Sequence, residues 1–207
     1  MNNKWNIFIY KWWAPVYDYV FNTGLFLRAR KEIFDVVSTE QGSKVLVIGV
    51  GTGADLPYLL NKGYKITAID YSTDMLKQSK KKFADPSITF REMDAQQLLF
   101  ENETFDFIVA NLTLTVVPDA KKTIKEMVRV LKKNGRFLVF DKFVPKNKKM
   151  SIGQKVLRPI IKVIGTDIGL DFYEVYKIVE NACEIIEDKH VMMKGLYRKI
   201  LVKRKDR

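Results

Sequence analysis

Three glycines at alternate positions, Gly49, Gly51 and Gly53, follow the apolar run VLVI and precede a helix-like segment. Because glycine has no Cβ, such a loop lets a ligand lie directly against the backbone. About 20 residues further along the chain, Asp70 ends a second apolar run, KITAID. A carboxylate at a strand end can accept two hydrogen bonds from the hydroxyls of a ribose. Together these residues predict a site for a ligand that contains a nucleoside.

The same residues allow two interpretations of that ligand. With Ala54 as its last position, the loop reads G-x-G-x-x-A, the pattern that binds a nicotinamide dinucleotide. With Gly53 as its last position, it reads G-x-G-x-G and suits the amino acid end of S-adenosylmethionine. Asp70 serves either ligand, so the loop and the aspartate alone leave both interpretations open.

The elements that must position these residues alternate along the chain. Apolar runs with little alternation indicate strands buried on both faces, as in a parallel sheet covered by helices. We therefore predict a doubly wound α/β domain with a mostly parallel, seven-stranded sheet and helices on both faces. Its central strands are expected at 44–49, 65–70, 87–93, 105–111 and 136–142, and its helices at 54–63, 72–84 and 119–135.

The two flanks of this core have their own patterns. Residues 1–43 are rich in aromatic side chains and predict two helices separated at Pro15. Beyond residue 142 we expect an interrupted helix at 144–165 and a helix at 171–182. Strand-like segments then flank Gly195 and predict an antiparallel hairpin at the sheet edge. We expect one domain, composed of a leader (1–43), a cofactor-binding core (44–142) and a closing segment (143–207).

Composition restricts the partners and the compartment. The 207 residues carry 36 Lys and Arg against 24 Asp and Glu, a net charge of +12, which favours nucleic acid or an anionic lipid surface. The single cysteine, Cys183, excludes an internal disulfide and a cysteine-based metal cluster, and it suits a buried position in a reducing compartment. Without an apolar run of about 20 residues, a cytoplasmic location is expected.

Beyond these features, the chain resembles the class I S-adenosylmethionine-dependent methyltransferases over nearly all its length. The resemblance lies in VLVIGVGTG, ITAIDYSTDML, FREMDAQQLLFENETFDFIVANLTLTVV and EMVRVLKKNGRFLVFD. RVLKKNG is similar to the RVLKPGG turn of that family. One departure is Val47, at a position where the family usually carries Asp or Glu. A nicotinamide enzyme would also need a substrate domain, for which 207 residues leave little room, so S-adenosylmethionine is the favoured ligand.

The resemblance implies roles for individual residues at the cofactor. Asp70 would hold the ribose, and Tyr71 and Met75 would form the walls of the adenine site. Asp94 would accept a hydrogen bond from the adenine amino group while the backbone of Ala95 approaches the ring. Met75 also suits an ordinary position in a helix core.

Further residues are implied at the methionine end and the acceptor. Asn111, Leu112 and Thr113 would line the space between them, since ligands lie outside the carboxyl ends of parallel strands. The sulfonium is already an activated methyl donor, so no covalent catalyst is expected, and the protein must position the acceptor and exclude water. The candidates for positioning are Tyr17, Asn111 and His190, although a lone histidine on a predicted strand is more often structural. No metal site is expected.

The identity of the acceptor rests on weaker patterns. NLTL lacks the N-P-P-Y type of motif that grips nucleic acid bases, and no separate RNA-binding module is visible. The stretches WWAPVYDYVF and GLYRKILVKR resemble bacterial phosphatidylethanolamine N-methyltransferases and, less closely, quinone C-methyltransferases. In such enzymes the leader folds over the cofactor, which makes Tyr10, Tyr17 and Asp18 candidate contacts, with Tyr17 first among them.

The leader also allows a membrane interpretation. Its aromatic and basic residues, with no acid before Asp18, suit a helix at an anionic lipid interface; they are Lys4, Trp5, Phe8, Lys11, Trp12 and Trp13. The tryptophans suit equally a lid packed on the sheet. We therefore expect a small-molecule or lipid acceptor, with the enzyme in the cytoplasm or peripheral at the inner membrane surface. The alternative from another class is an RNA-directed methyltransferase or RNA-binding relative.

Overall fold

The computed structural model describes residues 23–144, 156, 158, 159, 161 and 165–206, and its centre is one seven-stranded sheet. The strand order is β3-β2-β1-β4-β5-β7-β6. The strands are β1 (Lys44–Ile48), β2 (Lys65–Asp70), β3 (Ile88–Glu92), β4 (Phe105–Asn111), β5 (Leu131–Lys142), β6 (Cys183–Met192) and β7 (Tyr197–Arg204). The helices are α2 (Gly24–Phe34), α3 (Pro57–Leu60), α4 (Thr73–Lys82), α5 (Ala120–Val130) and α7 (Phe172–Tyr176), with a short 3-10 turn, η1 (Met193–Gly195).

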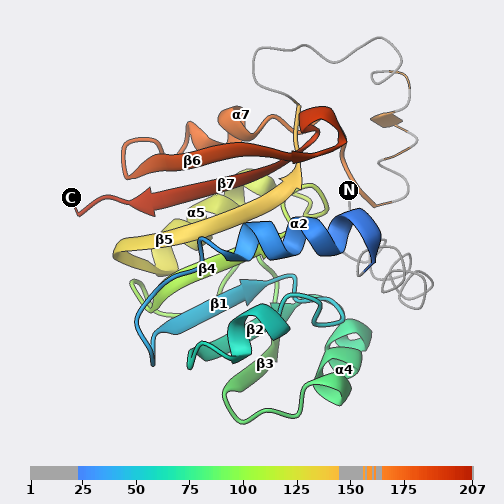
Figure 1. The fold of residues 1–207 in the computed structure, drawn as a ribbon. Coiled ribbons are helices and arrows are strands. Elements are labelled where there is room, and N and C mark those ends of the chain that lie inside the picture. Colours follow the sequence, from blue (N-terminus) through green and yellow to red (C-terminus); the bar gives the residue numbers. More distant parts are fainter. Residues whose placement is uncertain (1–22, 145–155, 157, 160, 162–164, 207) are drawn as a thin grey trace.

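The pairing of the strands confirms the predicted architecture. Strands β3, β2, β1, β4 and β5 are parallel, whereas β7 runs antiparallel to both β5 and β6. The β6–β7 hairpin turns around Gly195, as the sequence predicts. Figure 1 shows α2 in front of the sheet and α5 behind it. The carboxyl ends of the parallel strands therefore share one edge of the sheet.

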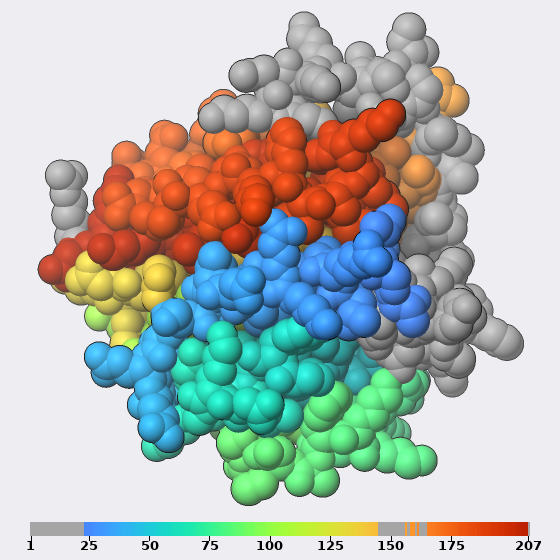
Figure 2. All heavy atoms as spheres, viewed as in Figure 1, coloured from blue at the N-terminus to red at the C-terminus, as the bar shows by residue number. Residues whose placement is uncertain are grey.

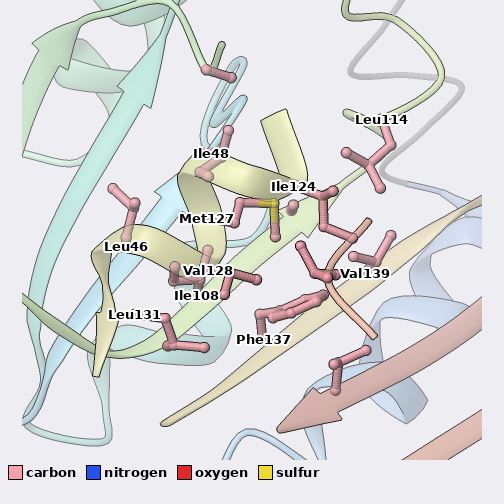
Figure 3. Packing of buried hydrophobic residues seen from close by; sticks show 14 of the residues in the cluster. Leu46, Ile48, Ile108, Leu114, Ile124, Met127, Val128, Leu131, Phe137 and Val139 are labelled. Carbon is pink, nitrogen blue, oxygen red and sulfur yellow. The ribbon is translucent and has the colours of Figure 1, made fainter. Parts of the chain in front are cut away.

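The sheet separates two layers of core. One layer fills the space between α5 and the sheet, where Ile124 and Met127 of the helix pack among strand residues such as Ile48, Ile108 and Phe137 (Figure 3). The apolar positions of α5 recur with a helical period, which places them on the face that meets the sheet. The other layer lies beneath α2 and includes the buried strand residues that alternate with the first set.

Helix α2 links the two halves of the sheet. In Figure 2 it lies as a blue band between the red C-terminal hairpin and the teal region of α3. Phe26 of α2 meets Tyr197 of β7 edge to face, with ring centroids 5.3 Å apart. At the other end of the helix, Phe34 stacks on Tyr58 of α3 at 5.0 Å. These ring contacts anchor α2 to β7 and α3, on either side of it.

The helix expected at 72–84 is present as α4 (Thr73–Lys82), whereas three other predicted helices are much shorter in the structure. The segment expected at 54–63 is helical only in α3, and that expected at 171–182 only in α7. The helix expected at 119–135 ends at Val130, because Leu131 is fully buried and pairs with Phe105 of β4 as the first residue of β5. Burial in the sheet overrides the good helix propensity of the lysines that follow.

Several expectations fall on other parts of the chain. Pro15, the aromatic leader before residue 23 and most of 144–165 lie outside the described residues. The division of the chain at residues 43 and 142 stays a prediction. Across the described residues, no helix combines the length and the apolar character that crossing a membrane requires.

Cys183 provides a test of this fold. It is buried at the start of β6, and burial raises the pKa of its thiol to about 11. The thiolate is the reactive form, so native protein at pH 8 should react with a thiol reagent about 100-fold more slowly than unfolded protein. The measurement is the labelling rate with and without denaturant. A Cys183→Ala variant supplies the blank, and rapid labelling of the native protein would contradict the burial.

Candidate functional site

The glycine loop after β1 has a backbone that few other residues could adopt. Gly49, Gly51 and Gly53 have φ angles of +68°, +55° and +89°. A Cβ on Gly49 would lie 2.6 Å from Thr113 Oγ1, and one on Gly53 would collide with Phe83 just after α4. A Cβ on Gly51 would meet no described atom within 4 Å. Two of the glycines thus permit close packing, and the third leaves open space against the backbone.

Asp70, at the end of β2, stabilises this loop by hydrogen bonds. Its Oδ2 accepts a hydrogen bond from Gly51 N at 2.8 Å, and its Oδ1 accepts one from Ser72 N at 2.8 Å. Burial raises the pKa of the Asp70 carboxyl, an effect that these amide donors oppose. Each carboxylate oxygen has two lone pairs, so the group can accept bonds from ribose hydroxyls while it holds the loop.

The residues predicted around adenine lie beyond Asp70. Tyr71 is exposed, whereas Met75 is buried at the start of α4, where its amide donates to the cap residue Ser72. Ala95 is buried. The carboxylate of Asp94 accepts hydrogen bonds from Gln96, through its backbone amide at 2.8 Å and through its side chain. An adenine amino group would share or displace the side-chain contact.

The loop that carries Asp94 and Ala95 is anchored by α5. Glu126 accepts a hydrogen bond from Leu98 N at 2.8 Å, and Arg129 donates to Leu98 O at 2.7 Å and Phe100 O at 2.8 Å. Glu126 and Arg129 also pair with each other, which lowers the pKa of the Glu126 carboxyl. Through Glu126 and Arg129, the EMVRVL segment thus fixes the position of this loop.

The end of β4 contacts the glycine loop from the other side. Thr113 Oγ1 donates to Ile48 O at 3.0 Å, in the strand that leads into Gly49. Leu112 has a φ of +53°, and its amide donates to Phe140 O of β5 at 2.7 Å. Asn111 is 6% exposed, and its amide nitrogen donates to Asp55 Oδ2 at 3.0 Å. The structure therefore brings Asn111 and Thr113 together with the glycine loop.

Two residues of this region escaped the sequence analysis. Arg30 of α2 donates from Nε to Asp55 Oδ1 at 2.7 Å, and both side chains are buried. Asp55 therefore links α2, the glycine loop and β4. The sequence does show an acid two positions after Gly53. No local pattern indicates that it pairs with an arginine 25 positions earlier.

A second buried carboxylate lies at the end of β5. Asp141 is fully buried and accepts hydrogen bonds from Thr115 N at 3.0 Å and Thr115 Oγ1 at 2.7 Å. Burial raises the pKa of Asp141 and lowers the pKa of the neighbouring Lys142. These contacts hold the segment after β4 against β5, on the side of the sheet edge away from Asp70.

The remaining candidates are not brought to this edge. His190 is exposed on β6, three strands from β4, or about 14 Å at the usual spacing, and its ring lies against Gly195. Tyr10, Tyr17 and Asp18 fall outside the described residues. Cys183 is buried at the outer end of the hairpin. Within the described ranges, no three His, Cys, Asp or Glu side chains are grouped as a metal site.

Comparison with known proteins identifies the family of this fold and site. The sequence pattern described as "Methyltransferase domain" matches residues 46–139. A phosphatidylethanolamine N-methyltransferase of Cereibacter sphaeroides is 31% identical over 192 residues, which cover 91% of this chain and 92% of that protein. The chain belongs to the class I S-adenosylmethionine-dependent methyltransferases.

Other relatives of the methyltransferase match less of its length or share the fold alone. A demethylmenaquinone methyltransferase of Renibacterium salmoninarum is 34% identical over 129 residues, 61% of this chain and 54% of that protein. A chain in the complex of the Haloferax volcanii Trm112 methyltransferase activator with a methyltransferase superposes with a TM-score of 0.78. It is 13% identical, with 99% of both chains covered.

The residues of the methyltransferase fit the co-substrate that its family implies. The open space beside Gly51 leaves the backbone accessible, the Asp70 carboxylate retains acceptor capacity, and Asn111 Oδ1 is a buried acceptor without a donor among the described residues. When bound, S-adenosylmethionine supplies a methyl group on a positively charged sulfur.

The open space beside Gly51 can be tested by filling it. Gly51→Ala adds a methyl group that meets no described atom within 4 Å, at a φ of +55° that costs some stability. The variant should bind S-adenosylhomocysteine at least about 10-fold more weakly than the wild type. Gly42→Ala is the matched control, because Gly42 also has a positive φ, +82°, and open space around it, but it lies before β1. Calorimetric titration of both variants measures the difference; equal affinities would contradict a ligand at Gly51.

Proposed function

We propose that this methyltransferase binds S-adenosylmethionine across the carboxyl ends of β1, β2 and β4 and transfers the methyl group to the amine of an aminophospholipid headgroup. The proposed contacts are those predicted from the sequence. They are Gly49, Gly51, Gly53, Asp70, Tyr71, Met75, Asp94, Ala95, Asn111, Leu112 and Tyr17. The geometry of the loop and of Asp70 supports the first part of this proposal.

One observation carries the choice of acceptor. The similarity to the phosphatidylethanolamine N-methyltransferase extends over 92% of that protein, whereas the demethylmenaquinone methyltransferase matches over 54% of its length. Class I cores share their cofactor-binding half, so resemblance outside that half is the part that reports on the acceptor. The full-length match includes segments on both sides of residues 46–139.

Methyl transfer requires little of the protein beyond positioning of the acceptor. An amine acceptor must present a neutral nitrogen in line with the bond between sulfur and methyl carbon, and holding it there replaces a bimolecular encounter. In this chain, Thr115 and Asp141 hold the segment after β4 against β5, beside the space where an acceptor would lie. Asn111 and Thr113, which bond to Asp55 and Ile48, would lie between that space and the glycine loop.

A quinone ring is the second candidate acceptor. The demethylmenaquinone methyltransferase has the higher identity, 34%, within the part of the chain that matches. Both acceptors are carried by lipids, so either one favours an enzyme that works at a membrane surface. The net charge of +12 supports an anionic surface, since basic residues are attracted to anionic headgroups.

The acceptor can be identified directly by methyl transfer from labelled S-adenosylmethionine. We expect label in the lipid fraction with vesicles that contain phosphatidylethanolamine, and none with free ethanolamine or RNA. Vesicles of phosphatidylglycerol that lack the amine control for binding without reaction. Transfer to demethylmenaquinone in preference to phosphatidylethanolamine would favour the second candidate and overturn the first.

The role of Asp70 predicts a pH dependence. Ribose hydroxyls donate to the charged carboxylate, so affinity for S-adenosylhomocysteine should fall as pH decreases through the pKa of Asp70. Because burial raises this pKa, the fall should lie above the ordinary carboxyl range near 4. Asp70→Asn should bind at least about 10-fold more weakly at pH 8 and lose that dependence. Asp70→Ala removes the carboxyl altogether, and unchanged affinity in either variant would contradict the ribose contact.

A further inference from the structure

One polar atom at the carboxyl ends of the parallel strands finds no partner among the described residues. Asn111 Oδ1 is buried, and the described part of the chain offers it no hydrogen-bond donor. Native structures supply donors to nearly all buried carbonyl oxygens, because an unpaired one loses its bonds to water and gains nothing in return. A bound molecule can supply the donor that the described residues do not provide.

The neighbours of Asn111 fix which end of its amide is presented. The carboxylate of Asp55 can only accept, so the amide must turn its nitrogen toward Asp55, where the bond is 3.0 Å long. Arg30 Nε donates to the other oxygen of Asp55 at 2.7 Å and so holds the carboxylate in place. Exchanging the oxygen and nitrogen of Asn111 would set two acceptors against each other. Its carbonyl oxygen therefore has one orientation.

This carbonyl lies at the carboxyl ends of the parallel strands, on the same side as the glycine loop. Asn111 is the last residue of β4, and Thr113, two positions on, donates to Ile48 O beside Gly49. Asp55 belongs to the same loop, two positions after Gly53. A ligand that lies along this loop would thus bring one end toward Asn111.

The local charge favours a cationic donor on that ligand. Arg30 compensates Asp55, so the pair adds little net charge, and the unpaired carbonyl contributes the negative end of its dipole. A primary ammonium group carries three N–H donors and a positive charge, which makes its bond to a carbonyl stronger than that of a neutral donor.

We propose that the side-chain carbonyl of Asn111 accepts a hydrogen bond from the ammonium group at the methionine end of S-adenosylmethionine, and that Asp55 and Arg30 are positioning residues that hold the amide in this orientation. The inference rests on the proposed cofactor site. Arg30 and Asp55 would thus fix the side chain that recognises the amino acid end, a role that the glycines and Asp70 do not fill. Through Arg30, α2 would contribute to this recognition.

Two probes separate this contact from the rest of the site. S-adenosylhomocysteine carries the amino acid end, whereas 5′-methylthioadenosine has the same nucleoside and sulfur without it. In calorimetric titrations, Asn111→Leu should weaken S-adenosylhomocysteine about 10-fold or more and leave the affinity for 5′-methylthioadenosine unchanged. A residue with a purely structural role would weaken both probes together.

Asp55→Asn tests the orientation and preserves side-chain size. The new amide can accept from Arg30 and donate to Asn111 Oδ1, which would turn the nitrogen of Asn111 toward the ligand and present a donor to the ammonium group. The same selective loss of S-adenosylhomocysteine affinity is expected. The double variant should lose little more than either single variant, because both changes act on one hydrogen bond.

An arginine and aspartate pair far from the glycine loop provides the control. Asp188 of β6 pairs with Arg198, whose Nε lies 2.9 Å from Asp188 Oδ1, and both belong to the C-terminal hairpin. Asp188→Asn should lower the melting temperature without changing the ratio of the two affinities. An unchanged ratio in folded Asn111→Leu and Asp55→Asn would overturn the inference and leave a buried water as the donor. If the wild-type protein binds neither probe, the proposed cofactor site itself is wrong.

Discussion

The close approach of β4 to the loop after β1 is the constraint on which the rest of this site depends. Thr113 Oγ1 donates to Ile48 O and occupies the space that a Cβ on Gly49 would fill. Because Gly49 lacks that atom, the ends of two neighbouring strands come together and the loop can fold back toward Asp70. The same two strand ends carry the open backbone at Gly51 and the buried link between Asp55 and Asn111.

The residues by which the sequence resembles its family have two different roles, proposed ligand contact and support of the fold. Asp70 and the glycines belong to the proposed cofactor site, whereas Glu126 and Arg129 of the EMVRVL segment hydrogen-bond to the backbone of the loop after β3. Asp106, of the FD pair before β4, accepts from Lys44 N and pairs with Lys132, so it ties β1, β4 and β5 together at the opposite edge of the sheet. A motif residue is therefore no guide to chemistry until its place in the fold is known.

The centre of the sheet was predictable from the sequence because β1 and β4 are buried on both faces and read as continuous apolar runs. The hairpin around Gly195 followed from its two flanking strands. The end of α5 was not predictable, because Leu131 leaves the helix to pair with Phe105, a contact 26 positions away. The same limit hid the partnership of Arg30 with Asp55. Local patterns report on periodicity, whereas both of these depend on which distant segments meet.

The position of β7 inside the sheet has a consequence for how the chain acquires its structure during synthesis. Strand β5 is complete at Lys142, whereas β7, the strand that pairs with its outer edge, ends only at Arg204. Among the described strands, β6 pairs with β7 alone. While the ribosome adds the intervening residues, the outer edge of β5 has no strand beside it. Its unpaired N–H and C=O groups and its apolar side chains are then exposed and can pair with other chains. During synthesis there is therefore an interval in which β1 to β5 are complete while the outer edge of β5 is still open to pairing with other chains.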